Sequence, residues 1–108
     1  MVTVYRKDDL TGIEGFTALL NLNCSTNNLS NFDISNNPFL TQLNCSSNQL
    51  TSLDVSQNTA LNYLRSSNNQ LRSLDVSQNT ALEYLNCRNN GITNLNVSRN
   101  TALIDFFK

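Results

Sequence analysis

Three cysteines are the most regular reactive side chains of this chain. Cys24, Cys45 and Cys87 recur at multiples of one fixed interval, and Ser66 occupies the place where a further cysteine would fall. A structural zinc site needs four converging Cys or His ligands, and the chain has no His. We predict buried structural thiols, because free Cys behaves as a small hydrophobe. A Cys24–Cys45 disulfide is within reach by Cα distance, although adjacent parallel strands hold their side chains side by side.

Carboxylates recur with the same spacing. Asp33, Asp54 and Asp75 are separated by the interval of the cysteines, and each is followed two places later by a serine. Asp and Ser side chains commonly accept or donate hydrogen bonds to nearby backbone groups, and this is the role we predict. Cation binding, which would relieve the repulsion between like charges, is the alternative.

Phenols and guanidinium groups form the third set. Tyr63 and Tyr84 are again one interval apart, with Arg65, Glu83 and Arg88 near them in sequence. Tyr and Arg are the residue types enriched at the centres of protein interfaces. We predict a ligand-binding patch made of these five residues. A cross-strand tyrosine pair that only stabilises a sheet surface is the alternative.

Composition excludes several functional classes. No His is present to activate the many serines, and no Gly-rich phosphate loop, CxxC or paired carboxylate motif occurs. Seven basic residues and a net charge of −1 give no footprint for nucleic acid. No stretch approaches the length of a membrane span. We therefore expect no catalytic residues, no metal, no cofactor, no nucleic-acid partner and no membrane insertion.

A 21-residue repeat positions these side chains. Its consensus is LxxLxCxxNxLxxLDVSxNTA, in four full units over 19–39, 40–60, 61–81 and 82–102, with a fifth begun at Leu103. It explains much of a composition with 20 Asn and 17 Leu among 108 residues. Repeats of this length stack into a solenoid, because one unit cannot bury its apolar side alone.

The first half of the repeat, LxxLxCxxNxL, is a leucine-rich-repeat signature with Cys in place of the third Leu. Through the phrases LNCSSNQLTSLDVSQNTAL and LTGIEGFTAL the chain resembles the internalin J type of bacterial leucine-rich-repeat proteins, with 21-residue, cysteine-containing repeats. The resemblance implies a secreted or cell-surface protein that binds or adheres. The first ten residues lack the apolar region of a signal peptide, and no anchoring segment is expected in this chain.

Alternation of Leu43 and Cys45 indicates a strand, and stacked strands form a parallel sheet. The segment around Leu53–Val55 repeats that spacing and predicts a second row of extended or turn segments, with little or no helix. The fold class is a short right-handed leucine-rich-repeat solenoid with a concave parallel sheet. Two asparagine rows, 27/48/69/90 and 37/58/79/100, are expected to close the turns and bond to their own copies in the next coil.

The two ends differ from the repeat. Residues 1–18 are expected to form an N-terminal cap, with a strand at residues 2–5 and a polar bend at 6–9, while 19–108 forms the single repeat domain. At the other end Ile104, Phe106 and Phe107 predict an apolar sheet edge, which favours association. Either the natural protein continues beyond Lys108 or this end docks on another copy.

Two hypotheses for function follow. The first is a non-enzymatic module that binds a protein or a glycan on the concave sheet through Tyr63, Tyr84, Arg65, Glu83 and Arg88. The second is a structural or self-associating scaffold that forms homo-oligomers through its end coils, Met1–Leu10 and Leu103–Lys108.

Overall fold

A computed structural model describes residues 2–3 and 9–108. The predicted cap residues 1 and 4–8 lie outside the described part, and so does most of the predicted strand and bend there. The six strands are β1 (Val2–Thr3), β2 (Asn21–Asn23), β3 (Gln42–Asn44), β4 (Tyr63–Arg65), β5 (Tyr84–Asn86) and β6 (Asp105–Phe107). One short 3-10 helix, η1 (Ile13–Gly15), precedes β2.

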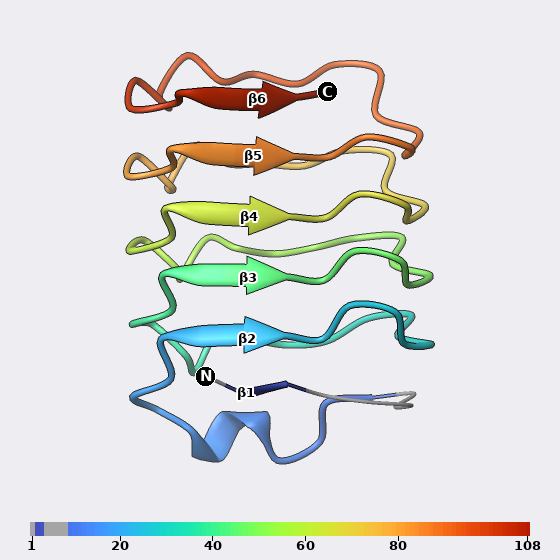
Figure 1. Cartoon of the computed structure of the whole chain (residues 1–108), viewed down its shortest axis with the longest axis vertical. Helices are drawn as coiled ribbons and strands as arrows, with labels where there is room; N and C mark the ends of the chain where they lie inside the picture. Colours follow the sequence, from blue (N-terminus) through green and yellow to red (C-terminus); the bar gives the residue numbers. More distant parts are fainter. Residues whose placement is uncertain (1, 4–8) are drawn as a thin grey trace.

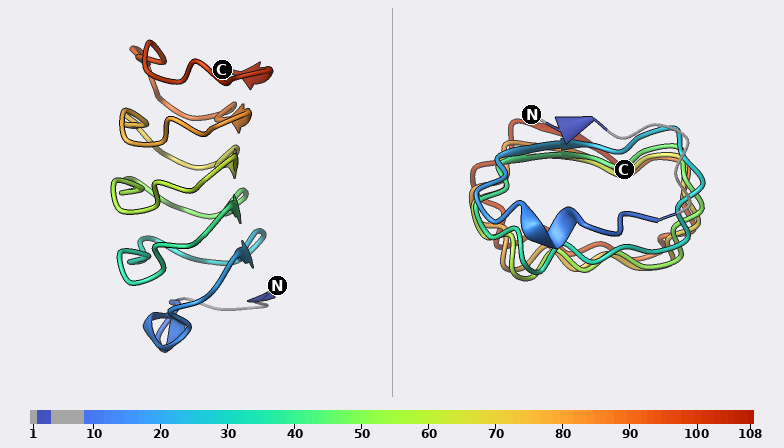
Figure 2. Two further views of the ribbon diagram at one scale, coloured as in Figure 1. Left: turned by 90° about the vertical axis from the view of Figure 1, so that its left-hand side faces the viewer. Right: turned by 90° about the horizontal axis from the view of Figure 1, so that it is seen from below.

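The strands form one parallel sheet in chain order, β1 to β6. Equivalent residues pair across the sheet: Leu22 lies opposite Leu43, and Leu64 opposite Leu85. Figure 1 shows the strands stacked one above another, and Figure 2 shows each coil closing as a flattened loop with the sheet on one long side. The predicted right-handed solenoid is confirmed, and η1 is the only helical turn in the described residues.

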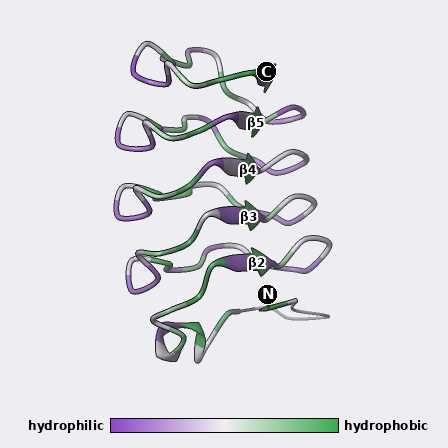
Figure 3. Cartoon of the chain, turned by 60° about the vertical axis from the view of Figure 1, so that its left-hand side comes forward, coloured by the Kyte–Doolittle hydropathy of each residue, from purple (hydrophilic) through white to green (hydrophobic). Residues whose placement is uncertain are grey.

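The core is a set of rows, each built from one repeat position. The central residue of each strand points inward, and Leu43, Leu64 and Leu85 have no exposed surface. Ile34, Val55 and Val76 close the core from the opposite side of the coil with at most 1% exposure. Figure 3 shows that the strands carry both apolar and polar residues and that the loops at the ends of the coils are largely polar. Burial of these rows is the main stabilising contribution, because an isolated three-residue strand is not stable.

Asparagine side chains close the turns at both ends of the coils by bonding to backbone groups. In the first row, the Asn48 Nδ2 donates to the carbonyl oxygens of Cys24 and Cys45, at 3.0 and 3.1 Å. Its Oδ1 accepts from the Leu29 N–H at 3.0 Å. In the second row, the Asn58 Nδ2 donates to the carbonyl oxygens of Ile34 and Asn37, both at 3.0 Å. The predicted copy-to-copy bonding is therefore found in the second row, where Asn58 donates to the backbone of its copy Asn37. It is wrong for the first row, where the Asn48 amide bonds to other backbone groups that lack a partner in the turn.

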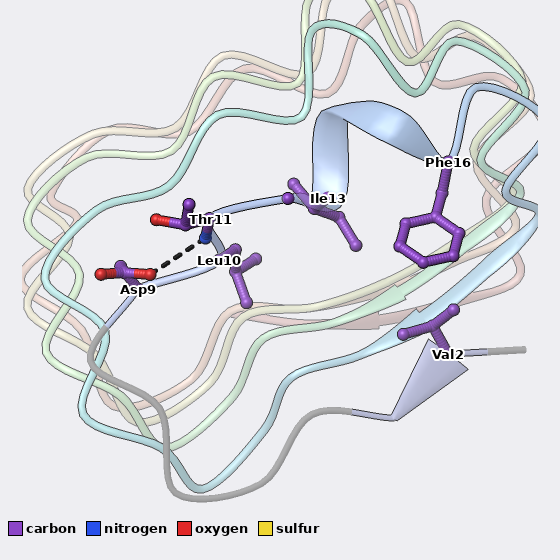
Figure 4. Close-up of a pocket in the computed structure, with 7 residues that line it drawn as sticks. Val2, Asp9, Leu10, Thr11, Ile13 and Phe16 are labelled. Atoms are coloured by element: carbon purple, nitrogen blue, oxygen red, sulfur yellow. Dashed lines mark hydrogen bonds between the residues drawn. The ribbon is translucent and has the colours of Figure 1, made fainter.

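The residues covering the first coil leave a hollow of about 350 Å³ at the N-terminal end. Val2, Leu10, Ile13 and Phe16 contribute to its lining, and the Asp9 carboxylate accepts from the Thr11 N–H at 3.0 Å (Figure 4). Leu10 and Ile13 are buried and belong to the core. We interpret this hollow as part of the packing that shields the first coil.

Candidate functional site

Residues on either side of each central strand leucine face solvent, because side chains alternate along a strand. Tyr63 and Tyr84 occupy the same position in β4 and β5 and are paired in register. Their rings stack with centroids 4.4 Å apart and planes 8° from parallel. The repeat itself places the rings together, since adjacent strands lie about 4.8 Å apart.

Phe107 in β6 extends this pair. Its ring centroid lies 5.7 Å from that of Tyr84, at an interplanar angle of 49°. The Arg88 guanidinium carbon lies 5.0 Å from the Phe107 ring centroid, within cation–π range. The sequence predicted Phe107 as a residue of the C-terminal edge, whereas the structure brings it onto the sheet face. We call Tyr63, Tyr84 and Phe107 the aromatic row.

Polar residues beside the aromatic row have distinct positions. The Arg65 Nε donates to the Ser67 Oγ at 3.4 Å. Partial burial raises the pKa of the Tyr63 phenol, Tyr84 adds to the rise, and the Arg65 guanidinium opposes it. Tyr63 is therefore a neutral phenol at physiological pH.

Glu83 and the remaining edge residues stand apart from the row. Glu83 is exposed at the start of β5, and its backbone N–H donates to the Asn62 carbonyl at 2.8 Å. Within residues 9–108 no hydrogen bond or ion pair joins its carboxylate to the aromatic row. Ile104 is 76% exposed and Phe106 is 39% exposed. Phe106 continues the inward leucine row of the sheet, opposite Leu85.

The three cysteines are free and buried, as predicted. Burial raises the pKa of Cys24 to about 12 and the pKa of Cys45 well above its ordinary value. Burial also raises the pKa of Cys87, against a smaller lowering by Lys108. Burial thus favours the protonated thiols over the thiolates, which are the nucleophiles and metal ligands.

The acidic row has the local bonding predicted for it. The carboxylates of Asp33, Asp54 and Asp75 accept from the backbone N–H of the serine two residues later, at 2.8 to 2.9 Å. Hydrogen bonds from these serines lower the pKa of each aspartate. In the described part of the chain no three His, Cys, Asp or Glu side chains are grouped to hold a metal ion.

A shallow hollow of about 200 Å³ lies beside the aromatic row and was not predicted from sequence. Its lining residues are Asn21, Leu22, Asn23, Gln42, Asn44 and Tyr63. The four amide residues occupy variable positions of the repeat on either side of the strand leucine. They are recognised as lining residues only in the structure, where the strand register places them next to Tyr63.

Comparison with known proteins finds the same fold in internalins. The chain is similar to the functional domain of InlJ from Listeria monocytogenes, which includes a cysteine ladder, with a TM-score of 0.87 and 37% sequence identity. The match covers 94% of this chain and 22% of that chain. The chain also has the fold of the internalin inlF from Listeria monocytogenes str. 4b F2365, with a TM-score of 0.78, 20% identity, and coverage of 95% of this chain and 39% of that one. No protein-family model and no curated protein matches the chain. None of its described residues forms a helix long and apolar enough to cross a membrane.

Proposed function

We propose that this chain, an internalin-like leucine-rich-repeat protein, is a non-enzymatic binding module that captures a protein ligand on the solvent-facing side of its sheet. The aromatic row is the observation that carries the proposal. Three rings from adjacent coils lie together on a sheet face that is otherwise amide-rich. Tyr and Arg anchors of this kind dominate binding energies at interfaces. A protein with this function would be secreted or located at the cell surface.

The five residues predicted from sequence have different roles in this proposal. Tyr63 and Tyr84 are the anchors, and Phe107 with Arg88 extends the contact surface. Arg65 flanks Tyr63 and supplies a positive charge. Glu83 lies at the rim, where an exposed charge contributes to specificity and association rate more than to affinity.

The test is a double substitution, Tyr63→Ala/Tyr84→Ala, in a binding screen against purified extracellular proteins. The wild-type chain is expected to retain one or more of them, and the double variant to bind at least about tenfold more weakly, as for interface hot spots. Gln57→Ala/Gln78→Ala is the matched control, because both glutamines are exposed at one repeat position on the opposite side of the coil. Equal binding by wild type and the tyrosine variant would remove the aromatic row from the site.

Self-association through the C-terminal coil is the second candidate. It is favoured by the exposure of Ile104 and Phe106 on a strand that pairs on one side only in the described structure. Light scattering of Phe106→Asp separates the two functions. A change from oligomer to monomer supports the scaffold, and a monomeric wild type at high concentration rules it out.

A further inference from the structure

The hollow between Tyr63 and the amides of β2 and β3 has a built polar lining. The Asn44 Oδ1 accepts from both the backbone N–H and the hydroxyl of Ser46, at 3.1 and 2.7 Å. The Asn23 Oδ1 accepts in the same way from Ser25, at 3.1 and 2.7 Å. These bonds fix both carboxamides with their oxygens engaged. Their NH₂ groups make no hydrogen bond within the described part of the chain and remain as donors.

The two donors are arranged in register. Asn23 and Asn44 are paired across β2 and β3, and Asn21 and Gln42 are paired in the same way. Adjacent strands lie about 4.8 Å apart, which sets the spacing of the paired amides. Neither the Gln42 nor the Asn21 side chain makes a hydrogen bond in residues 9–108, so each adds a donor and an acceptor. The lining thus offers several hydrogen-bonding groups to one small ligand.

Tyr63 supplies an apolar wall. Tyr84 covers one face of its ring, at a centroid distance of 4.4 Å and an interplanar angle of 8°. Because the rings stack along the direction that joins neighbouring strands, the other face of Tyr63 is turned toward β3, where Gln42 is its register partner. Tyr63 is one of the residues that line the hollow, and the ring face toward β3 is the one that Tyr84 leaves uncovered.

Charge and size restrict the ligand. None of the six lining residues is ionised at neutral pH, so the lining offers no ion pair to an anionic or cationic ligand. Its volume of about 200 Å³ is below the roughly 300–1,000 Å³ of pockets that hold drug-sized molecules. The ligand that fits is a single uncharged ring with hydroxyl groups at its edge and C–H groups on its face.

From this geometry we propose that the hollow is a subsite for one neutral hexopyranose unit, stacked on the free face of Tyr63 and hydrogen-bonded by Asn23, Asn44 and Gln42. The sugar hydroxyls accept from the Asn23 and Asn44 NH₂ groups and donate to the Gln42 and Asn21 oxygens. The C–H face of the ring packs on Tyr63. The inference rests on the proposed binding function and deepens it by adding a sugar class to the ligand of the same sheet face.

Side-chain NH₂ signals in ¹⁵N-labelled protein provide the test, titrated with the methyl glycosides of glucose, galactose and mannose. At least one glycoside is expected to shift the signals of Asn23, Asn44 and Gln42 with a Kd of about 1 mM, the range for a ligand of this size. Glucuronic acid, the anionic counterpart, is expected to bind more weakly. No shift at concentrations far above that Kd, or a preference for the anion, would overturn the proposal.

Asn44→Asp is the informative variant. It keeps the oxygen that accepts from Ser46 but replaces the free donor with an acceptor, and we expect sugar affinity to fall at least tenfold. Asn96→Asp is the control, since Asn96 makes the same local bond to the Ser98 N–H on the other side of the coil. If Asn44→Asp fails to fold, Gln42→Glu makes the equivalent change at an exposed position. Unchanged affinity in the folded variant would contradict the proposed contacts.

Failure of this subsite and failure of the protein-binding site are distinguishable. Phe107→Ala alters the aromatic row at its far end and leaves all six lining residues of the hollow in place. If sugars shift the amide signals but no protein is captured, the subsite stands without the protein-binding function. If protein capture depends on Tyr84 and Phe107 while no sugar binds, only the subsite fails.

Discussion

Single residues in this protein are constrained by the repeat position they occupy, and Ser66 is the clearest departure. It stands in the cysteine row, fully buried, and its hydroxyl is a buried group without a hydrogen-bond partner. In the equivalent positions the Cys45 Sγ lies 3.5 Å from the Arg65 carbonyl oxygen and the Cys87 Sγ lies 3.6 Å from that of Phe107. The longer C–S bond allows a thiol to reach a carbonyl that a hydroxyl at this site does not reach.

Ser66→Cys is expected to raise the free energy of unfolding by about 1 kcal/mol, because a buried hydroxyl without a partner is replaced by a weakly polar thiol. Urea denaturation measures the change. The reciprocal variant Cys45→Ser, at a position with no exposed surface, is expected to lower stability by a similar amount. A destabilised Ser66→Cys would mean that the slot is too small for sulfur.

The buried thiols also predict loss of stability at alkaline pH. The ordinary pKa of 9.0 applies to the unfolded chain, whereas burial raises the pKa of Cys24 to about 12 in the folded state. Below pH 9 the Cys24 thiol is protonated in both the folded and the unfolded state, so its burial contributes fully to stability. As pH rises from 9 toward 12 the unfolded state loses protons first, so stability falls by up to about 1.4 kcal/mol per pH unit for each such thiol.

The urea midpoint of the wild type at several pH values between about 8 and 11 tests this dependence. A variant with Cys24 and Cys45 both replaced by Ala provides the comparison, because tyrosine and lysine titrate equally in both proteins. We expect the variant to have the shallower pH dependence. Identical slopes would show that these thiols ionise as readily in the folded chain as in the unfolded one.

At the scale of the coil, buried asparagine amides satisfy the carbonyl oxygens of the turns. Asn58 is completely buried, and its Nδ2 serves two carbonyl oxygens of the preceding coil. Its own Oδ1 has no partner. The amide is therefore needed for its NH₂ group.

Asn58→Ala is expected to lower the free energy of unfolding by about 2–4 kcal/mol, because two buried carbonyls lose their donor. Asn58→Asp is expected to be at least as damaging, since it points a carboxylate at those carbonyls. Asn96→Ala, at an exposed position, should change stability by under about 1 kcal/mol. Urea denaturation of the three variants is the measurement, and equal effects at positions 58 and 96 would contradict this role.

Much of each coil could be predicted from the sequence. The period identified which residues are equivalent, and alternation around Leu43 identified which of them point inward. The period did not identify the hydrogen-bond partners of Asn48. A repeat shows which residues are equivalent, but it does not show how far along the stack a side-chain amide reaches to a carbonyl oxygen. Phe107 was assigned to the self-association edge, and its contact with Tyr84 was not predicted, since that contact depends on ring orientation. Asn23 and Asn44 were missed because their function depends on which amide atoms are already bonded.

The whole molecule is a stack in which each coil contacts mainly its neighbours, so stability should vary along it. Leu40, Leu61 and Leu82 have no exposed surface, whereas Leu103 at the same position is half-buried. Val55 and Val76 are likewise buried, whereas Val97 is half-buried. The last coil thus has less of its apolar surface removed from water than the central coils.

Hydrogen exchange is expected to follow this gradient. The Cys45 N–H, which donates to the Arg65 carbonyl at 2.9 Å, should exchange more slowly than the Cys87 N–H, which donates to Phe107 at 2.8 Å. The bonds have similar lengths, so a difference in rate would report coil stability and not bond geometry. Uniform protection of the two amides would indicate that the stack opens only as a whole.

The side-chain amides of the second asparagine row donate to the preceding coil, whereas backbone hydrogen bonds between neighbouring coils run in both directions. Asn58 donates back to Ile34 and Asn37, Asn79 donates back to Val55 and Asn58, and Asn100 donates back to Val76 and Asn79. Each coil is thus finished by the coil that follows it in the chain. During synthesis from the N-terminus, a coil that has just emerged still has open turn carbonyls, and the next coil supplies their donors. A repeat grafted after the last coil therefore supplies the asparagine that donates to the turn carbonyls of that coil. A repeat grafted before the first coil instead depends on residues of the first coil to donate to its own turn carbonyls.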